Sequence, residues 1–493
     1  MKANQVIFSS PQFQILSDKQ IQALCDAGLE ILERTGVHIH HPEAVDILQG
    51  AGARVLESEP TKFNVKIPSY LVEKAIRTVP KRFTVYNRRG ERTLLVEGQN
   101  VYFGTNASAI NYSDPITGEA RLFGPEDSAN AARVADYLDH IDFVMFGGQL
   151  GDCISSKISD RISFKQVVCN TTRPIMFCCY SSQAAQDILD MAELVVGGHE
   201  RYRNRPFLMH YSEPISPLVH GFEGVDKLLF CADHSIPLIY IPMPLGGATA
   251  PATLAGILAV NIAEVMSGLV IHQLRKEGAP FVFGGIPSVM DARTMAYPYG
   301  APESALLIAC LTEISHYFSL PMFGTAGFTD SKLLDVQCGV DVAFSVLMAA
   351  LSGAHLVHDV GLLSTAPSLS FELMVLGNEI IRWIEHVMQG ISITPETLCL
   401  DLIHKVGPGG NFLQEDHTFE HYREWYFSRF FDHNPHEKWA EEGRRIMLDH
   451  LHEKVQSILQ AHRPEPLPQD VVRMLDEMEK KWISTVMSTK GAA

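Results

Sequence analysis

Short apolar runs return at regular intervals along the middle of this 493-residue chain, and each ends in a glycine-rich or polar loop. Most are followed by a longer segment with the apolar spacing of a helix. Eight strand–helix units in about 250 residues is the requirement of a (β/α)8 barrel, so we predict an α/β fold of the TIM-barrel type. The runs occupy residues 101–104, 143–146, 174–177, 207–210, 236–240, 281–284, 320–323 and 354–358.

The segments on either side of the predicted barrel have different patterns. Residues 1–97 predict helices and a small hairpin, as an N-terminal extension that covers one end of the barrel. The barrel itself is assigned to residues 98–388. Strand patterns stop after it, so residues 389–493 predict a C-terminal helical extension, whose aromatic helices allow a homo-oligomer.

The composition excludes some partners. A formal net charge of -17 argues against nucleic acid and against an anionic membrane surface. Nine scattered cysteines and an N-terminus without a secretory signal predict a reduced, cytoplasmic setting. The longest apolar stretch, residues 254–271, carries Asn261, Glu264 and Ser267 on one helical face, which predicts a buried crossover helix rather than a membrane span.

A barrel of this type has its active site at the carboxyl ends of the strands, so the residues that follow each strand are the candidates. For any one of them, packing or a satisfied loop hydrogen bond is the competing interpretation. As a set they predict a mouth rich in aromatics and thioethers with few fixed charges. Such a lining suits a small, partly apolar or cationic ligand.

Two cysteines and two glycines suggest other chemistry. Cys178 and Cys179 follow the third strand and could offer thiolates to zinc, so a zinc-dependent thiol methyltransferase is one alternative. No third ligand stands at an obvious companion position, and no metal site is predicted. Gly246 and Gly247 lack the spacing of a nucleotide-binding motif but could hold an anion through backbone N–H groups.

Three segments of the chain resemble the trimethylamine:corrinoid methyltransferase family. Family members are (β/α)8 barrels that move a methyl group from a methylated amine to the Co(I) centre of a separate corrinoid protein. The resemblance therefore implies a corrinoid-protein partner, cob(I)alamin as methyl acceptor and no tightly bound cofactor. The segments are 324–337 (Gly-Thr-Ala-Gly-Phe-Thr-Asp-Ser-Lys-Leu-Leu-Asp-Val-Gln), 354–361 (Ala-His-Leu-Val-His-Asp-Val-Gly) and 407–413 (Gly-Pro-Gly-Gly-Asn-Phe-Leu).

The trimethylamine enzymes carry pyrrolysine near the first of these segments, whereas this chain has standard residues there, including Val336 and Cys338. It therefore resembles the non-pyrrolysine branch, whose members demethylate quaternary amines such as glycine betaine in one-carbon metabolism. A quaternary nitrogen leaves as a neutral amine, so the barrel need only present the methyl group in line with the nucleophile. A non-catalytic betaine-binding protein is the alternative from another class.

The resemblance assigns roles at the strand ends. We expect His358 to face the substrate, and we expect Asp330 and Gln337 to organise the methyl-transfer face, so these three are the predicted catalytic residues. Asp330 could equally cap the following helix. Cofactor contacts are predicted for Asp335, Gly246 and Gly247, and substrate contacts for Asn106, Tyr180, His210, Tyr211, Glu213 and Phe328.

Overall fold

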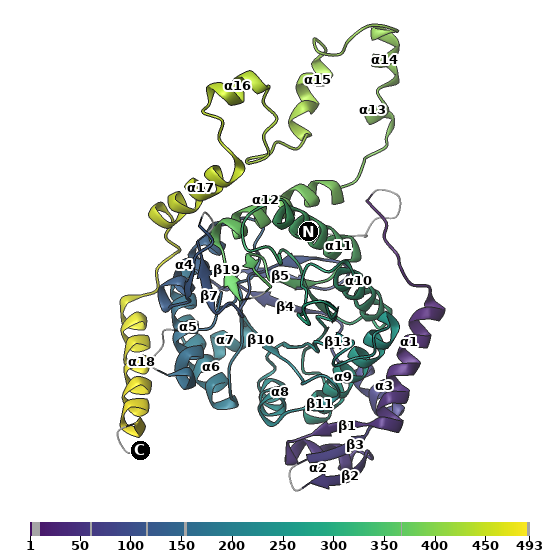
Figure 1. Ribbon diagram of the computed structural model, residues 1–493, viewed down its shortest axis with the longest axis vertical. Coiled ribbons are helices and arrows are strands. Elements are labelled where there is room, and N and C mark those ends of the chain that lie inside the picture. The colour runs from purple at the N-terminus through teal and green to yellow at the C-terminus, as the bar shows by residue number, and fades with distance from the viewer. Residues whose placement is uncertain (2–9, 60–61, 115–116, 152–154, 366, 491–493) are drawn as a thin grey trace.

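The computed structural model describes residues 1, 10–59, 62–114, 117–151, 155–365 and 367–490. Residues 2–9, on which the expectation about a secretory signal falls, lie outside the described part. A parallel sheet with helices around it forms the body of the molecule (Figure 1). In spatial order its seven strands are β6 (Tyr102–Phe103), β17 (Leu356–His358), β16 (Met322–Thr325), β14 (Phe281–Gly284), β12 (Leu238–Tyr240), β10 (Leu208–Ser212) and β9 (Ile175–Phe177).

These seven strands lie where seven of the eight apolar runs predicted them, and every pair is parallel. The sheet curls, because β6, the earliest of these strands in the chain, pairs with β17, the latest. The α/β class is therefore confirmed. The eight-stranded barrel is not confirmed among the described residues, because the predicted second strand forms only isolated bridges.

Residues 143–146 pair with both sheet edges only through isolated parallel bridges, Gly104 to Phe143 and Val144 to Ile175. Side-chain oxygens accept hydrogen bonds from backbone amides that a regular strand would pair with backbone carbonyls. The Asp142 carboxylate accepts a hydrogen bond from the Phe103 amide at 2.9 Å, and the Met145 amide donates to the Thr105 hydroxyl at 2.8 Å. The segment therefore bridges the edges without becoming a strand.

Helices cover the outer face of the sheet (Figure 1). The long helix α9 is buried, as predicted, and the residues of its polar strip are buried with it. Its Glu264 is fully buried and accepts hydrogen bonds from the Leu218 amide at 2.6 Å and the Ser216 hydroxyl at 2.8 Å. The covering helices are α4 (Pro125–Tyr137), α5 (Ser156–Asn170), α6 (Ser182–Val196), α7 (His199–Asn204), α8 (Phe222–His234), α9 (Leu254–Arg275), α10 (Pro302–Tyr317), α11 (Val336–Ser352) and α12 (Phe371–Met388).

Among the described helices, α9 alone is long and apolar enough to cross a membrane by length and composition, and 78% of its most apolar window is buried within the protein.

Four further short strands form a small sheet at the strand ends. They are β7 (Asn111–Ser113), β8 (Ala120–Leu122), β18 (Leu362–Leu363) and β19 (Ser368–Leu369). A two-stranded pair, β13 (Leu245–Gly246) and β15 (Ser288–Val289), lies in the neighbouring loops.

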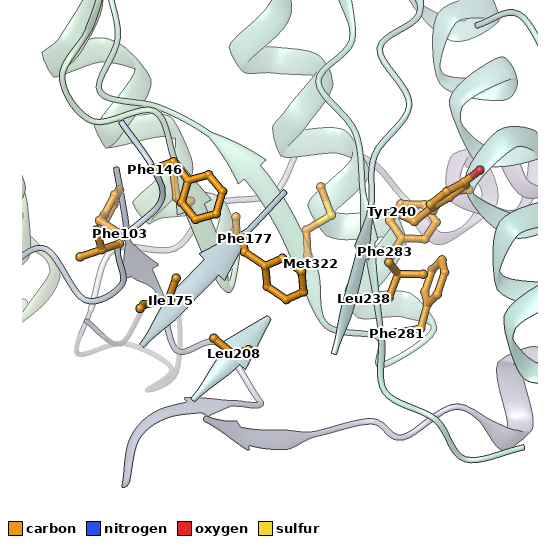
Figure 2. Close-up of a cluster of buried hydrophobic side chains, with 14 of the residues drawn as sticks. Phe103, Phe146, Ile175, Phe177, Leu208, Leu238, Tyr240, Phe281, Phe283 and Met322 are labelled. Carbon is orange, nitrogen blue, oxygen red and sulfur yellow. The ribbon is translucent and has the colours of Figure 1, made fainter. Parts of the chain in front are cut away.

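Strand residues alternate between two hydrophobic clusters, as the two-residue period of a strand requires. One set packs against the helices, and Figure 2 shows members such as Phe177, Tyr240 and Phe283. The other set, which includes Met176 and Ile239, points to the inside of the curled sheet.

The N-terminal hairpin fills the inside of the sheet. Val85, Leu94 and Val96 of β4 (Phe83–Tyr86) and β5 (Arg92–Val96) join the inner cluster and are almost completely buried. The predicted hairpin thus packs into one end of the sheet. The extension also contains a small sheet that the sequence did not predict, built from β1 (Val37–Ile39), β2 (Arg54–Glu59), β3 (Lys62–Lys66) and the body strand β11 (Val219–His220), beside α1 (Asp18–Glu30), the π-helix η1 (Ile31–Thr35), α2 (Pro42–Gly50) and α3 (Ser69–Thr78).

The C-terminal segment is helical in its described residues. Its elements are α13 (Pro395–Leu398), α14 (Leu400–Val406), α15 (Asp416–His421), the 3-10 turn η2 (Tyr422–Glu424), α16 (His436–Glu441), α17 (Met447–Ala461) and α18 (Gln469–Lys490). Helix α17 packs on α12 and α4, and α18 packs on α5. The domain boundaries at 97/98 and 388/389 remain predictions.

The bridge at Gly104 generates the first testable prediction. A Cβ atom at this position would overlap the ring of Phe143, so Gly104→Ala should lower the free energy of unfolding by about 1–3 kcal/mol. Chemical denaturation measures the change. The control is Gly339→Ala in α11, where nothing lies within 4 Å of the added atom and the better helix propensity should stabilise by up to about 1 kcal/mol. Equal effects of the two changes would contradict the packing at the bridge.

Candidate functional site

A cavity of about 390 Å³ opens at the carboxyl ends of the parallel strands. Its walls include the ends of β9, β10 and β17, whose residues are far apart in the sequence but converge because parallel strands end at one edge. Four of the twelve predicted site residues, Tyr180, Tyr211, Glu213 and His358, line it. The other eight lie outside the lining: Asn106, His210, Gly246, Gly247, Phe328, Asp330, Asp335 and Gln337.

His358, the last residue of β17, presents a neutral imidazole to the cavity. The side chain is buried, and burial lowers its pKa to about 3. Its Nδ1 lies 3.2 Å from Oδ1 of Asp359, but neither ring nitrogen has a hydrogen-bond partner of suitable geometry among the described residues. A buried nitrogen with an unused hydrogen-bonding position is available to a ligand.

Asp359 follows directly and is the buried carboxylate of the cavity. Its φ of 83° is in a region that a residue with a side chain rarely adopts, and such strain is often found at functional sites. The Thr325 hydroxyl donates a hydrogen bond to its carboxylate. Burial nevertheless raises the pKa of Asp359 to about 7, so the group changes charge near neutral pH.

Aromatic rings stand beside this acid. The ring of Tyr211 lies 5.6 Å from that of His358, centroid to centroid, and Tyr299 also lines the cavity. Burial raises the pKa of both tyrosines, so both stay neutral phenols. Phe328 lies behind this wall and packs edge-on against Tyr299 at 5.4 Å. Neutral aromatic rings next to a carboxylate form an environment that favours a cation.

The lining of the cavity also contains a lysine. Lys227 of α8 is the only lysine or arginine among the described residues of the lining, and its Nζ donates to the Cys179 carbonyl at 2.7 Å. Burial raises the pKa of Glu213 while Lys227 opposes that rise. The carboxylate of Asp160, on α5, accepts a hydrogen bond from the Tyr180 amide at 3.1 Å, and burial raises the pKa of Asp160. Lys227 thus shares the cavity lining with two carboxyl groups whose pKa values burial raises.

The residues after β16 support the cavity from outside. The Asp330 carboxylate accepts hydrogen bonds from the amides of Tyr299 at 3.1 Å and Gly300 at 2.8 Å, so it holds the loop that carries the Tyr299 ring. The cap of α11 is Asp335, whose carboxylate accepts from the Cys338 amide at 3.0 Å, and not Asp330. Gln337 is exposed on the first turn of α11.

Asn106 and His210 lie beneath the cavity wall. Both are fully buried, and neither amide atom of Asn106 has a hydrogen-bond partner among the described residues. Nε2 of His210 lies 3.4 Å from Sγ of Cys179, and burial lowers its pKa well below the usual value. Both could reach a ligand only after a local movement or through water.

The two glycines predicted to contact a cofactor have close packing roles. A Cβ atom on Gly246 would lie 2.5 Å from Cδ1 of Ile257 on α9, and Gly247 adopts a φ of 89° that favours glycine. Both stand at the pairing of β13 with β15, away from the residues that line the cavity. Their contact with a cofactor remains a prediction.

The cysteines give no support to the zinc alternative. Burial raises the pKa of the Cys178 thiol to about 12 and raises that of Cys179 as well, so both remain protonated thiols at neutral pH. Within the described ranges, no group of three or more histidine, cysteine, aspartate or glutamate residues is placed to hold a metal ion.

Sequence reasoning missed Lys227, Asp160 and Tyr299. The first two lie on covering helices, at positions that a search confined to strand ends does not reach. Tyr299 lies in the long loop before α10, where no local pattern marks which side chain turns inward. One clue was available for Lys227. It is the single lysine of an amphipathic helix, and it lies in the first half of that helix, close to the predicted mouth.

Comparisons with known proteins show the family of the chain. The family model described as trimethylamine methyltransferase (MTTB) matches residues 1–484. The trimethylamine methyltransferase MttB of Desulfitobacterium hafniense is 32% identical over 459 residues, which are 93% of this chain and 92% of that protein. The chain belongs to the trimethylamine methyltransferase family.

A glycine betaine methyltransferase from another strain of Desulfitobacterium hafniense is 26% identical over 94% of this chain and 95% of its own length. Residues 324–337 are all standard amino acids. Together with these two relatives, this fits the non-pyrrolysine branch. The crystal structure of the monomethylamine methyltransferase MtmB of Methanosarcina barkeri aligns with a TM-score of 0.47 and 15% identity over 90% of this chain and 88% of that chain.

The raised pKa of Asp359 predicts a pH-dependent affinity for small quaternary ammonium ions. If only the ionised carboxylate attracts the cation, binding of tetramethylammonium should tighten by up to about ninefold from pH 6 to pH 8, since the ionised fraction rises from about 10% to about 90% around a pKa of about 7. His358, with a pKa of about 3, stays neutral over this range.

Titration calorimetry at each pH measures the affinity. Asp359→Asn should flatten the profile, and Glu213→Gln, which removes another cavity acid with a raised pKa, should leave most of it. A flat profile in the unmodified protein, or a profile that only Glu213→Gln removes, would show that Asp359 is not the responsible group.

Proposed function

We propose that this protein is a methyltransferase that takes a methyl group from a quaternary amine, of the glycine betaine or carnitine type, and delivers it to the Co(I) of a separate corrinoid protein. The supporting observation is the polarity of the cavity. Asp359, Tyr211 and Tyr299, which line the cavity together with Lys227, favour a cation, and Lys227 favours an anion. A trimethylated zwitterion has those two charges in one small molecule.

A cavity of about 390 Å³ has room for a small amine. We expect the corrinoid of a separate protein to approach it from the mouth. When bound there, the corrinoid supplies the nucleophile that receives the methyl group. The chain's own residues bind the amine and aim one N–CH₃ bond at the mouth.

Charge dispersal sets a limit on how tightly the cavity should hold the cationic group of the substrate. The positive charge on nitrogen disappears as the methyl group leaves, so a strong cage would stabilise the bound substrate more than the transition state. A single carboxylate with a raised pKa and two flanking phenols give a moderate attraction. The neutral imidazole of His358 can donate to or accept from the substrate without adding a charge.

We assign the predicted residues to this scheme as follows. His358 contacts the substrate, with Tyr180, Tyr211 and Glu213 around it, and Asp330 acts as a positioning residue through the Tyr299 loop. Phe328 supports the same ring from behind. Asp335 and Gln337 lie on the outer surface at the start of α11, where a docked corrinoid protein could reach them.

We further interpret the curled sheet as a (β/α)8 barrel closed by residues 142–146. The isolated bridges from Phe143 to Gly104 and from Val144 to Ile175 support this interpretation. We also propose a cytoplasmic location. The cysteines of the described residues are all free, which fits a reducing compartment.

A panel of methylated amines tests the reaction. Methylation of pre-reduced cob(I)alamin, followed by its spectral change, should be faster with glycine betaine or carnitine than with trimethylamine by more than tenfold in kcat/KM, about 1.4 kcal/mol of transition-state binding. Trimethylamine has no carboxylate, so it cannot make the interaction with Lys227 that we expect for a betaine. Equal or faster turnover of trimethylamine would contradict the substrate class, and binding of betaines without any transfer would favour the non-catalytic alternative.

Substitution of Lys227 tests the contact with the carboxylate separately. Loss of a charged hydrogen bond of about 1.5–3 kcal/mol predicts that Lys227→Met lowers kcat/KM for glycine betaine by roughly 10- to 100-fold. Turnover or binding of tetramethylammonium, which has no carboxylate, should change little. Lys227→Arg is the matched control and should retain much of the betaine activity. If Lys227→Met affected both ligands equally, the lysine would be structural, through its bond to the Cys179 carbonyl.

A further inference from the structure

A hollow of about 660 Å³ lies apart from the cavity, and four of the eight described residues that line it are arginines. It shares no lining residue with the cavity. Its walls come from the turn between β4 and β5, the end of α6, and α7 with the residue that follows it. The lining residues are Arg88, Arg89, Gly90, Val195, Val196, Arg201, Asn204 and Arg205.

Backbone hydrogen bonds place the turn at the amino ends of the parallel strands. The Arg88 amide donates to the Thr172 carbonyl at 2.8 Å, and the Tyr86 amide donates to the Pro206 carbonyl at 2.9 Å. Residues 172 and 206 come just before β9 and β10, whose carboxyl ends form part of the cavity wall. The hollow and the cavity therefore lie at opposite ends of the sheet.

Local contacts hold the turn in one shape. Oδ1 of the buried Asn87 accepts hydrogen bonds from the amides of Arg89 at 3.0 Å and Glu91 at 2.9 Å. Gly90 has a φ of 79°, and a Cβ atom there would lie 2.9 Å from Cδ of Arg205. Glycine thus lets the turn approach the Arg205 side chain closely, and the arginines of the two elements meet in a preformed site.

The protein balances little of the positive charge in the hollow. Arg89 pairs with Glu91 at 2.8 Å and lies 3.9 Å from a carboxylate oxygen of Glu465. Among the described residues, no carboxylate oxygen lies within 4.0 Å of a side-chain nitrogen of the other three arginines of the lining. Like charges gathered in this way repel one another, so the hollow is electrostatically suited to an anion.

Arg88 is the buried member of the group, with 8% of its surface exposed. Its guanidinium donates to the carbonyl oxygens of Val168, at 2.7 Å, and of Glu465. Burial lowers the pKa of Arg88, although Asp136 and Glu465 partly oppose this from a greater distance. A buried cation that is paired only with neutral carbonyl groups is costly, and an anion in the hollow would offset that cost.

The chemistry of the arginines favours a compact anion with phosphate groups. A guanidinium presents parallel N–H groups that match two oxygens of a phosphate, and several guanidinium groups can share the oxygens of adjacent phosphates. A long polyanion such as a nucleic acid would extend beyond the hollow and meet the negative charge of the chain, which has a formal net charge of -17. A small molecule stays among the arginines.

We propose that this hollow binds a small molecule that carries two or more adjacent phosphate groups, of the pyrophosphate or nucleoside diphosphate class. Arg88, Arg201 and Arg205 supply the charge that the phosphates neutralise, and Arg89 adds a fourth guanidinium. The bound anion joins the hairpin turn to α7. Binding to the folded state alone stabilises that state, so the ligand should also protect the protein against unfolding.

Titration calorimetry of the full chain with inorganic pyrophosphate, at a fixed salt concentration, tests the proposal. Arg201→Gln and Arg205→Gln should each weaken the binding by about tenfold or more, because each removes a charged hydrogen-bond donor. The matched control is Arg203→Gln, which removes the same charge from the same helix at a position outside the lining. Salt screens such a charge, so the control should change the affinity by less than about threefold.

Melting temperatures give an independent readout. All three substituted arginines are exposed, so the variants without ligand should melt as the unmodified protein does. Pyrophosphate and ADP should raise the melting temperature of the unmodified protein and of Arg203→Gln, and should raise that of Arg201→Gln and Arg205→Gln less. Citrate, a polyanion without phosphate, should bind more weakly than pyrophosphate.

Four results would overturn the proposal. They are an absence of pyrophosphate binding, equal losses in Arg203→Gln and in the two lining variants, citrate binding as tight as that of pyrophosphate, and an RNA oligonucleotide that binds at these arginines while pyrophosphate does not.

Discussion

The inner cluster of the curled sheet is the constraint on which the other features depend. Alternate strand residues such as Met176 and Ile239 point inward, where the hairpin residues Val85 and Leu94 complete the packing. The hairpin fills the interior from one end, and the cavity among the described residues lies at the carboxyl ends of the strands. The cavity is therefore a consequence of how the opposite end is closed.

The electrostatics of the cavity follow from the same closure. Burial without a full set of partners raises the pKa of Asp359 to about 7 and lowers that of His358 to about 3. A site with an acid that is only partly ionised at neutral pH and a base that stays neutral exerts a weak, adjustable pull on a cation. Lys227, whose Nζ donates to the Cys179 carbonyl, adds a positive charge to the lining. These features suit a small dipolar ligand whose positive charge must be released during the reaction.

The positions of the strands and the polar face of α9 were predictable because they depend on short-range periodicity. Seven of the eight apolar runs form parallel strands, and the eighth, at 143–146, pairs only through isolated bridges. The exception was not predictable, because it arises from side chains of Asp142 and Thr105 that take the place of backbone partners. The capping role of Asp335 rather than Asp330 depends on where the helix begins, which pattern alone locates only to within a few residues.

The sequence by itself determined the α/β class, the edge of the sheet at which polar residues gather, and the family. Periodicity and motif order are local properties of the sequence, so they can be recognised without knowing the tertiary contacts. Only the tertiary structure decided which side chains enter the cavity. It brought Lys227 and Asp160 in from covering helices, turned Tyr299 inward through its loop, and left Asn106 and His210 beneath the wall. These outcomes depend on helix rotation and loop path, which long-range packing sets and which no local pattern records.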